Sequence, residues 1–221
     1  MTPVFFYDNL LRIMEIIPNF AVLEGGDGCG TTTQLSLLEK RLLNIGKPSI
    51  FSTFEPTNSE IGKIIRSALK GENPVKPQTL ALLFAADRRE HIYGKNGIIE
   101  RAANGELVVC DRYVLSSLVY QGIECGDELP FSLNSPYPFP ELTVFLDIEP
   151  EIALTRMKNR SSLEIFEYRD FQEKVRLKYL TLIEIYKKKG VKIEIIDASK
   201  NMHEVEEQLW SVISEMPIFK R

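Results

Sequence analysis

A glycine-rich segment after a short apolar run constrains the fold more than any other feature of this sequence. Residues 20–24 are mostly apolar and of strand length, and GGDGCGTTTQ follows them directly. Gly25 and Gly30 are separated by four residues, and Thr31 and Thr32 come next. This is the spacing of the G-x-x-x-x-G-K-[ST] loop between a strand and a helix, except that Thr31 stands where the lysine is expected. The sequence therefore predicts a strand, a tight loop and a helix beginning near Thr31.

A loop of this kind is suited to binding a phosphate group. Its glycines let the backbone curl with successive N–H groups pointing inward, and the helix start adds the positive end of its dipole. Thr32 takes the position at which a hydroxyl binds magnesium. The segment alone also fits a turn without a ligand, and a dinucleotide fingerprint fits less well because the glycines read G-x-G-x-G. The candidate phosphate-binding residues are Gly25, Gly28, Gly30, Thr31, Thr32 and Thr33.

Strand-length apolar runs alternate with segments of helical periodicity. The runs are nearly continuous in hydrophobicity, which is typical of strands buried on both faces. They cover residues 20–24, 49–53, 107–111, 142–147 and 192–197. The helical segments cover residues 32–43, 59–69, 78–93, 116–123, 151–159 and 168–188. This order predicts an α/β fold with a five-stranded parallel sheet flanked by helices. Residues 125–141 contain four prolines and are expected to be a loop.

Composition favours one globular domain and excludes several functional classes. The chain has 221 residues, of which 44% are hydrophobic and 26% charged, as expected for a chain with a packed core. Its net charge is −4 without a long basic run, so composition supports neither nucleic acid nor an anionic membrane as a partner. Three scattered cysteines and two histidines indicate neither a disulfide framework nor a zinc site, which suits a cytoplasmic protein.

The N-terminal segment differs in character from the rest. Residues 1–18 are apolar but interrupted by Asp8, Arg12 and Glu15, and no basic stretch precedes them. These features argue against a secretion signal. We expect an extra amphipathic helix or arm, with translation from Met14 as the alternative. Residues 19–221 are expected to form the single domain.

Three blocks of the sequence resemble the signature segments of thymidylate kinases. They are LEGGDGCGTTTQ, LLFAADRREH and DRYVLSSLVYQG, and weaker similarity runs through EPTNSEIGKIIR, VFLDIEPEIAL and IDAS. The resemblance extends from about residue 19 to the C-terminus. It implies the fold of P-loop nucleoside-monophosphate kinases, with a mobile lid at about 156–170. It also implies MgATP and dTMP as substrates, ATP and Mg²⁺ as the bound cofactors, and a homodimer.

The acceptor site is expected around one helix face. Phe84 and Arg88 are four residues apart on a predicted helix, so they share a face and present an aromatic ring and a fork of donors. Without the neighbouring blocks, a core phenylalanine beside a surface arginine would fit equally well. The resemblance implies that Phe84 stacks on thymine and that Arg88 bonds its carbonyl. It further assigns the nucleoside pocket to Ser117, Tyr120 and Gln121.

The same resemblance implies roles around the acceptor phosphate. Arg112 would hold that phosphate, Asp111 would lie near the magnesium with Thr32, and Asp27 would contact the acceptor sugar or its phosphate. Glu55 matches an element that shapes the phosphate site. Two departures weaken that match, because Phe54 replaces the usual arginine before Glu55 and a usual glycine pair is replaced at residues 57–58. Arg66, in the following helix, is one candidate for the missing charge.

The absent loop lysine leaves a deficit of positive charge. Phosphoryl transfer needs cations around the transferred group, because negative charge spreads over its oxygens. Arg156 and Arg160 are four residues apart in the lid-like segment and are expected to supply this charge, as is Arg169. The resemblance also places Glu167 near the acceptor sugar, and Ala198 and Ser199 around adenine. The expected catalytic residues are therefore Asp27, Arg112, Arg156 and Arg160.

Two alternatives to a dTMP kinase stay open from the sequence. A protein that keeps the nucleotide pocket but lacks the lysine would bind nucleotides with little turnover. A kinase for another pyrimidine monophosphate, such as dUMP, would use many of the same residues. The joint presence of Asp27, Phe84, Arg88, Asp111 and Arg112 argues against a pocket kept only for its shape.

Overall fold

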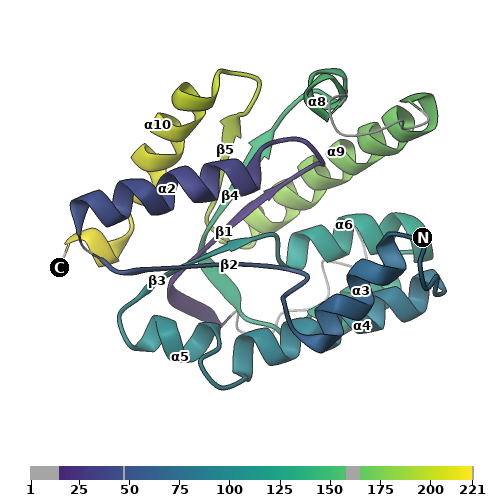
Figure 1. Ribbon diagram of the computed structural model, residues 1–221, viewed down its shortest axis with the longest axis horizontal. Helices are drawn as coiled ribbons and strands as arrows, with labels where there is room; N and C mark the ends of the chain where they lie inside the picture. Colours follow the sequence, from purple (N-terminus) through teal and green to yellow (C-terminus); the bar gives the residue numbers. More distant parts are fainter. Residues whose placement is uncertain (1–14, 47, 158–164, 221) are drawn as a thin grey trace.

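The computed structural model describes residues 15–46, 48–157 and 165–220, with side chains of the last segment described from residue 168. A five-stranded parallel sheet forms its centre, in the order β2-β3-β1-β4-β5 (Figure 1). The expectation of a parallel α/β sheet is confirmed. The strands are β1 (Ile16–Gly25), β2 (Ile50–Phe54), β3 (Leu107–Asp111), β4 (Phe139–Asp147) and β5 (Ile193–Asp197).

Helices cover both faces of the sheet, because successive side chains of a strand point to opposite sides. Phe20 and Val22 of β1 belong to one apolar cluster, and Ala21 and Leu23 to the other. Residues of α4, α5, α6 and α9 complete the first cluster, and those of α2, α8 and α10 complete the second (Figure 1). The helices are α2 (Thr31–Ile45), α3 (Glu60–Leu69), α4 (Pro77–Tyr93), α5 (Ile98–Ala103), α6 (Val114–Cys125), α7 (Glu128–Asn134), α8 (Pro150–Met157), α9 (Ile165–Lys188), α10 (Met202–Ile213) and the 3₁₀ turn η1 (Pro217–Lys220).

The central position of β1 creates a point at which the strand order reverses. β1 pairs with β3 on one side, where Leu23 lies opposite Asp111, and with β4 on the other, where Gly25 lies opposite Leu146. Ligands in open α/β sheets bind outside the carboxyl ends of the strands at such a point. The glycine-rich loop leaves β1 there, so the fold directs it to the expected ligand edge.

Local sequence explains where several helices begin and end. Ser59 caps α3 by accepting a hydrogen bond from the amide of Gly62, and Asn201 forms a capping box with Glu204 at the start of α10. Gly46 ends α2 at φ 84°, a backbone conformation that glycine adopts without strain.

The proline-rich segment is a correction to the sequence analysis. Residues 125–141 are not one loop, because they contain α7 and the start of β4. Pro130 lies in the first turn of α7, where a missing N–H costs no helical hydrogen bond. Pro140 lies opposite Ile17 beside a register irregularity in the β1–β4 ladder. Both prolines therefore occupy positions that regular structure tolerates.

Other expected boundaries shift by a few residues. β1 begins at Ile16, so residues 16–18 of the expected N-terminal extension belong to the sheet, while residues 1–14 lie outside the described part. The helices α5 and α10 were not expected from the sequence. Within the described residues, no helix combines the length and apolar character needed to cross a membrane.

Candidate functional site

The glycine-rich loop connects β1 to α2, and at two of its positions the backbone has a conformation that residues with a side chain rarely adopt. Gly28 and Gly30 have φ values of 80° and 101°. A Cβ atom on Gly28 would also lie 2.9 Å from the carbonyl oxygen of Ala153. No side chain of the described residues caps the start of α2, and its first turn carries no acidic residue. The first amides of α2 are therefore free to donate hydrogen bonds to an anion, because no cap among the described residues occupies them.

Thr31, at the lysine position, is buried. Its short side chain brings no positive charge to the loop. Cys29, also in the loop, packs in the apolar cluster under α2, and burial raises the pKa of its thiol to about 11. A thiol that holds its proton at neutral pH acts as a small apolar side chain.

Thr32 and Asp111 meet where the loop faces the end of β3. The hydroxyl of Thr32 donates to Oδ2 of Asp111 at 2.6 Å. The other carboxylate oxygen, Oδ1, is buried and has no hydrogen-bond partner among the residues that the structure describes. Buried polar atoms normally have a hydrogen-bond partner, so the lack of one at Oδ1 among the described residues indicates that a ligand binds here. A hydroxyl beside a carboxylate suits Mg²⁺, which takes few protein ligands and completes its shell with phosphate and water.

Arg112 lies directly in front of the loop. Its backbone has φ 69°, an uncommon conformation for a residue with a side chain. Its guanidinium donates from Nη1 to the carbonyl oxygen of Gly25 at 2.8 Å and from Nη2 to Oδ1 of Asp27 at 2.9 Å. Both side chains remain partly exposed, at 23% for Arg112 and 36% for Asp27. A cation thus stands at the solvent side of the loop, within reach of an incoming anion.

Asp27 accepts from three further side chains, two of which the sequence analysis did not single out. Tyr120 donates at 3.0 Å, Tyr168 at 2.7 Å and Nε2 of Gln172 at 3.0 Å. The amide of Asp27 donates in return to Oε1 of Gln172 at 3.1 Å. Burial, followed by the Asp27 carboxylate, raises the pKa of Tyr168, so the phenol stays a donor. Tyr168 and Gln172 are four apart on α9, and that spacing was the available signal.

Arg88 and Glu55 form a buried ion pair beside the loop. Their side chains are only 1% and 2% exposed, and Nε and Nη2 of Arg88 donate to Oε2 of Glu55 at 2.9 and 2.6 Å. Nη2 also lies within hydrogen-bond distance of the Ser117 hydroxyl and of the Tyr113 carbonyl, and Nη1 donates to Asn134. Arg88 is therefore enclosed by protein groups, whereas sequence geometry had suggested an open fork of donors.

The remaining acceptor-side residues lie on α4 and α6. Phe84 is half-buried on α4, one turn before Arg88. Gln121 is buried on α6, and its Oε1 finds no partner within the described parts of the chain.

Phe54, where an arginine was expected, is exposed. Arg66 donates from Nη1 to the carbonyl oxygens of Pro56 and Thr57, at 2.9 and 2.6 Å, and so braces the loop after β2.

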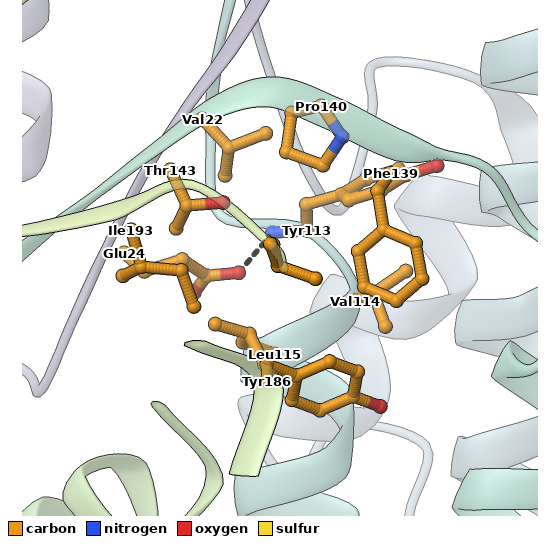
Figure 2. A pocket seen from close by; sticks show the side chains of 11 residues that line it. Val22, Glu24, Tyr113, Val114, Leu115, Phe139, Pro140, Thr143, Tyr186 and Ile193 are labelled. Carbon is orange, nitrogen blue, oxygen red and sulfur yellow. Dashed lines mark hydrogen bonds between the residues drawn. The ribbon is translucent and has the colours of Figure 1, made fainter. Parts of the chain in front are cut away.

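Glu24 is buried next to the site and binds the start of α6. Its buried carboxylate accepts from the amides of Tyr113 and Ser116, at 3.0 and 3.3 Å, and from the hydroxyls of Ser116 and Tyr179. Figure 2 shows Glu24 bonded to the backbone of Tyr113 among apolar side chains. The void that they line holds about 10 Å³, room for one water molecule. This pocket is part of the core, and Glu24 fixes the start of α6 next to Arg112.

Of the residues expected in a lid, Arg156 and Arg169 lie in the described part of the chain and have different partners. Arg156 donates from Nη1 to the carbonyl of Ala198 at 2.8 Å and from Nη2 to those of Ser199 and Lys200, which joins α8 to the turn after β5. Its guanidinium is therefore engaged at that turn. Arg169 pairs with Glu151 and Glu173 at the surface. Arg160 and the side chain of Glu167 lie outside the described residues.

Comparison with known proteins adds independent information. The family described as thymidylate kinase matches residues 23–209. A putative thymidylate kinase of Treponema pallidum is 41% identical over 89% of this chain and 95% of its own length. Probable thymidylate kinases of Pyrobaculum aerophilum and Methanococcus aeolicus are 40% and 42% identical over 91% and 86% of the chain, covering 99% and 93% of those relatives.

Proposed function

The chain belongs to the thymidylate kinase family, and from that membership we propose that it transfers the γ-phosphate of MgATP to dTMP, giving dTDP and ADP. The P–O bond between the γ-phosphorus and the β,γ-bridging oxygen breaks, and a new bond forms to an oxygen of the acceptor phosphate. That oxygen is already ionised at neutral pH, so the reaction needs no strong general base. The observation that carries the proposal is that the Thr32–Asp111 pair and the Arg112 guanidinium both contact the glycine-rich loop or the start of α2.

The donor phosphates would bind the loop and the start of α2. The free amides at the start of α2 and the positive end of its dipole would face these phosphates, and Gly28 and Gly30 bring no side chain near the anion. Thr32 and Asp111 would hold Mg²⁺ through the hydroxyl and the unpartnered carboxylate oxygen. The ion would neutralise charge on the β- and γ-phosphates. Ala198 and Ser199 would border the adenine.

Arg112 is the proposed clamp on the acceptor phosphate. Its guanidinium now contacts Asp27, but Asp27 has three other donors, in Tyr120, Tyr168 and Gln172. The acceptor phosphate can therefore take Nη2 of Arg112 without leaving Asp27 unpartnered. Asp27 would remain between the two phosphates and contact the acceptor sugar or its phosphate, with Glu167 near the sugar.

The thymine base would lie between α4 and α6. Phe84 would stack on the ring, and Arg88 with Ser117 would meet a base carbonyl. Gln121 would accept the N–H of the base with its unpartnered Oε1. Tyr120 would border the sugar, and Glu55 would hold Arg88 in place.

The positive charge missing at Thr31 is proposed to come from the lid. Arg156 is bound to the turn after β5, so Arg160, four residues later in the sequence, is the better candidate to reach the transferred group. We also propose a homodimer, as the resemblance to thymidylate kinases implies, and a cytoplasmic location.

A coupled assay of ADP release tests the function directly. The full chain would be given MgATP with dTMP, dUMP, dCMP or dGMP. Turnover with dTMP above the other acceptors supports the proposal. Tight dTMP binding by calorimetry without ADP release would instead identify a nucleotide-binding protein with little turnover.

A further inference from the structure

We infer that His91 is a positioning residue for the acceptor base: it fixes the Glu55 carboxylate, which in turn orients Arg88 toward the base pocket. The inference rests on the proposed dTMP site. It concerns a side chain that does not contact the proposed substrate and to which the sequence analysis gave no role.

Four side chains from two elements and one loop form a continuous chain of hydrogen bonds. Oγ1 of Thr53, on β2, lies 2.7 Å from Nε2 of His91, on α4. Nδ1 of His91 lies 3.0 Å from Oε1 of Glu55. Glu55 then accepts from Nε and Nη2 of Arg88 with its other oxygen. His91 and Arg88 are three apart on α4, so both reach the same carboxylate from one helix face.

The protons in this chain can be placed from the chemistry of the groups. A carboxylate only accepts, so Nδ1 of His91 must donate to Glu55. With the imidazole neutral, Nε2 is then an acceptor, and the Thr53 hydroxyl donates to it. Glu55 therefore fixes the tautomer, and the Thr53 hydroxyl, which can donate or accept, satisfies the other ring nitrogen. Each of the two carboxylate oxygens has a separate partner on α4.

Fixing both oxygens of Glu55 controls more than the ion pair itself. The amide of Glu55 is held by the carbonyl of Asp111 at 3.1 Å, so His91 restrains the free end of the side chain. A carboxylate with partners at both oxygens is restricted in rotation, and the position of its Oε2 determines where the two N–H groups of Arg88 lie. Nη2 of Arg88 also lies 3.0 Å from the hydroxyl of Ser117, a residue proposed to meet the base. Loss of the His91 contact would therefore disturb acceptor binding and leave the ATP side unchanged.

Three substitutions at His91 separate this role from simple packing. His91→Asn keeps an amide near the position of Nδ1, so it retains a donor for Glu55. His91→Gln places its amide nearer Nε2 and keeps the contact to Thr53, and His91→Leu removes both contacts. Thr53→Val tests the far end. His203→Gln, the same chemical change at an exposed histidine of α10, is the matched control.

The measured quantities are KM and kcat for dTMP and ATP, together with the melting temperature. We expect His91→Leu and His91→Gln to raise the KM for dTMP roughly tenfold, with the KM for ATP within about twofold of wild type. His91→Asn should recover most of the dTMP affinity. A smaller rise, of a few fold, is expected for Thr53→Val.

Several outcomes would overturn the inference. They are an unchanged dTMP KM in both His91→Leu and His91→Gln, an equal rise in both KM values that follows the melting temperature, or no recovery in His91→Asn. If His91→Leu does not fold, the comparison of His91→Gln with His91→Asn decides. Absence of wild-type turnover would refute the proposed kinase, and calorimetric dTMP affinities of the same variants would then decide the positioning role. A wild type that does not bind dTMP would refute both.

Discussion

The Glu55–Arg88 pair predicts a large and specific effect of removing one charge. Both side chains are almost completely buried, at 1% and 2% exposure, so solvent does not screen the pair. Glu55→Gln keeps the size and shape of the side chain but leaves the guanidinium without a counter-charge. Breaking a buried pair in this way costs about 3–5 kcal/mol. For a chain of this length that corresponds to a fall in Tm of roughly 6–20 °C.

Denaturant unfolding of the full chain measures this cost, with Glu106→Gln as the matched control. Arg101 pairs with Glu106 at 3.2 Å, but these side chains are 29% and 26% exposed. The control should therefore change the free energy of unfolding by about 1 kcal/mol or less. A Glu55→Gln variant that unfolds at the same denaturant concentration as the control would show that the buried pair does not carry the stability assigned to it.

A double variant separates stability from function. Arg88→Met combined with Glu55→Gln removes both charges, and such replacements often restore the stability that a single change destroys. We expect the double variant to unfold later than Glu55→Gln alone, yet to lose dTMP binding. Recovery of dTMP affinity together with stability would contradict a role for Arg88 at the base.

Three further predictions concern the proposed metal site, the positive charge near the loop, and the buried Glu24. Asp111→Asn should lower kcat on the order of 10²-fold and raise the magnesium concentration needed for half-maximal rate, whereas unchanged magnesium dependence would remove Asp111 from the metal site. Thr31→Lys should raise kcat if charge at the loop limits the rate, and Arg160→Ala should lower it on the order of 10²-fold; no change in the second variant would exclude Arg160 from the mechanism. Burial raises the pKa of Glu24 above its ordinary 4.5, against the lowering effect of its hydrogen bonds to Ser116 and Tyr179. The folded chain therefore keeps this proton at pH values at which the unfolded chain has released it, so the free energy of unfolding of the wild type should fall as pH rises from 4.5 through the raised pKa. Glu24→Gln should flatten that part of the stability profile. Equal slopes in both proteins would contradict this.

Local features were predictable because they depend on local sequence. The five strands follow from short apolar runs, of which those of β1, β3 and β4 are largely buried on both faces whereas the edge strands β2 and β5 are partly exposed. The loop conformation follows from the glycines at 28 and 30. The α7 helix was missed because proline in a first turn obeys a positional rule that proline content alone does not express.

Most of the missed site features depend on contacts between distant residues. Gln172 meets Asp27 across 145 positions, and Asn134 meets Arg88 across 46. The spacing of Phe84 and Arg88 correctly placed them on one helix, one turn apart. It could not show that Glu55 and Asn134 would enclose the guanidinium, because burial depends on where other elements pack.

The sheet order has a consequence for how such a protein can diverge. β3 and β2 carry Asp111, Arg112 and the approach to Glu55, while β4 and β5 lead to α8 and the turn at Ala198. Within the described residues the two flanks meet at β1 and its loop, and again where α9 packs on α6 and the Tyr179 hydroxyl lies 2.7 Å from that of Ser116. For the proposed kinase, substitutions among the residues of α4 and β2 can therefore alter which monophosphate is chosen, while Asp111 and the turn at Ala198 keep their proposed roles toward the triphosphate.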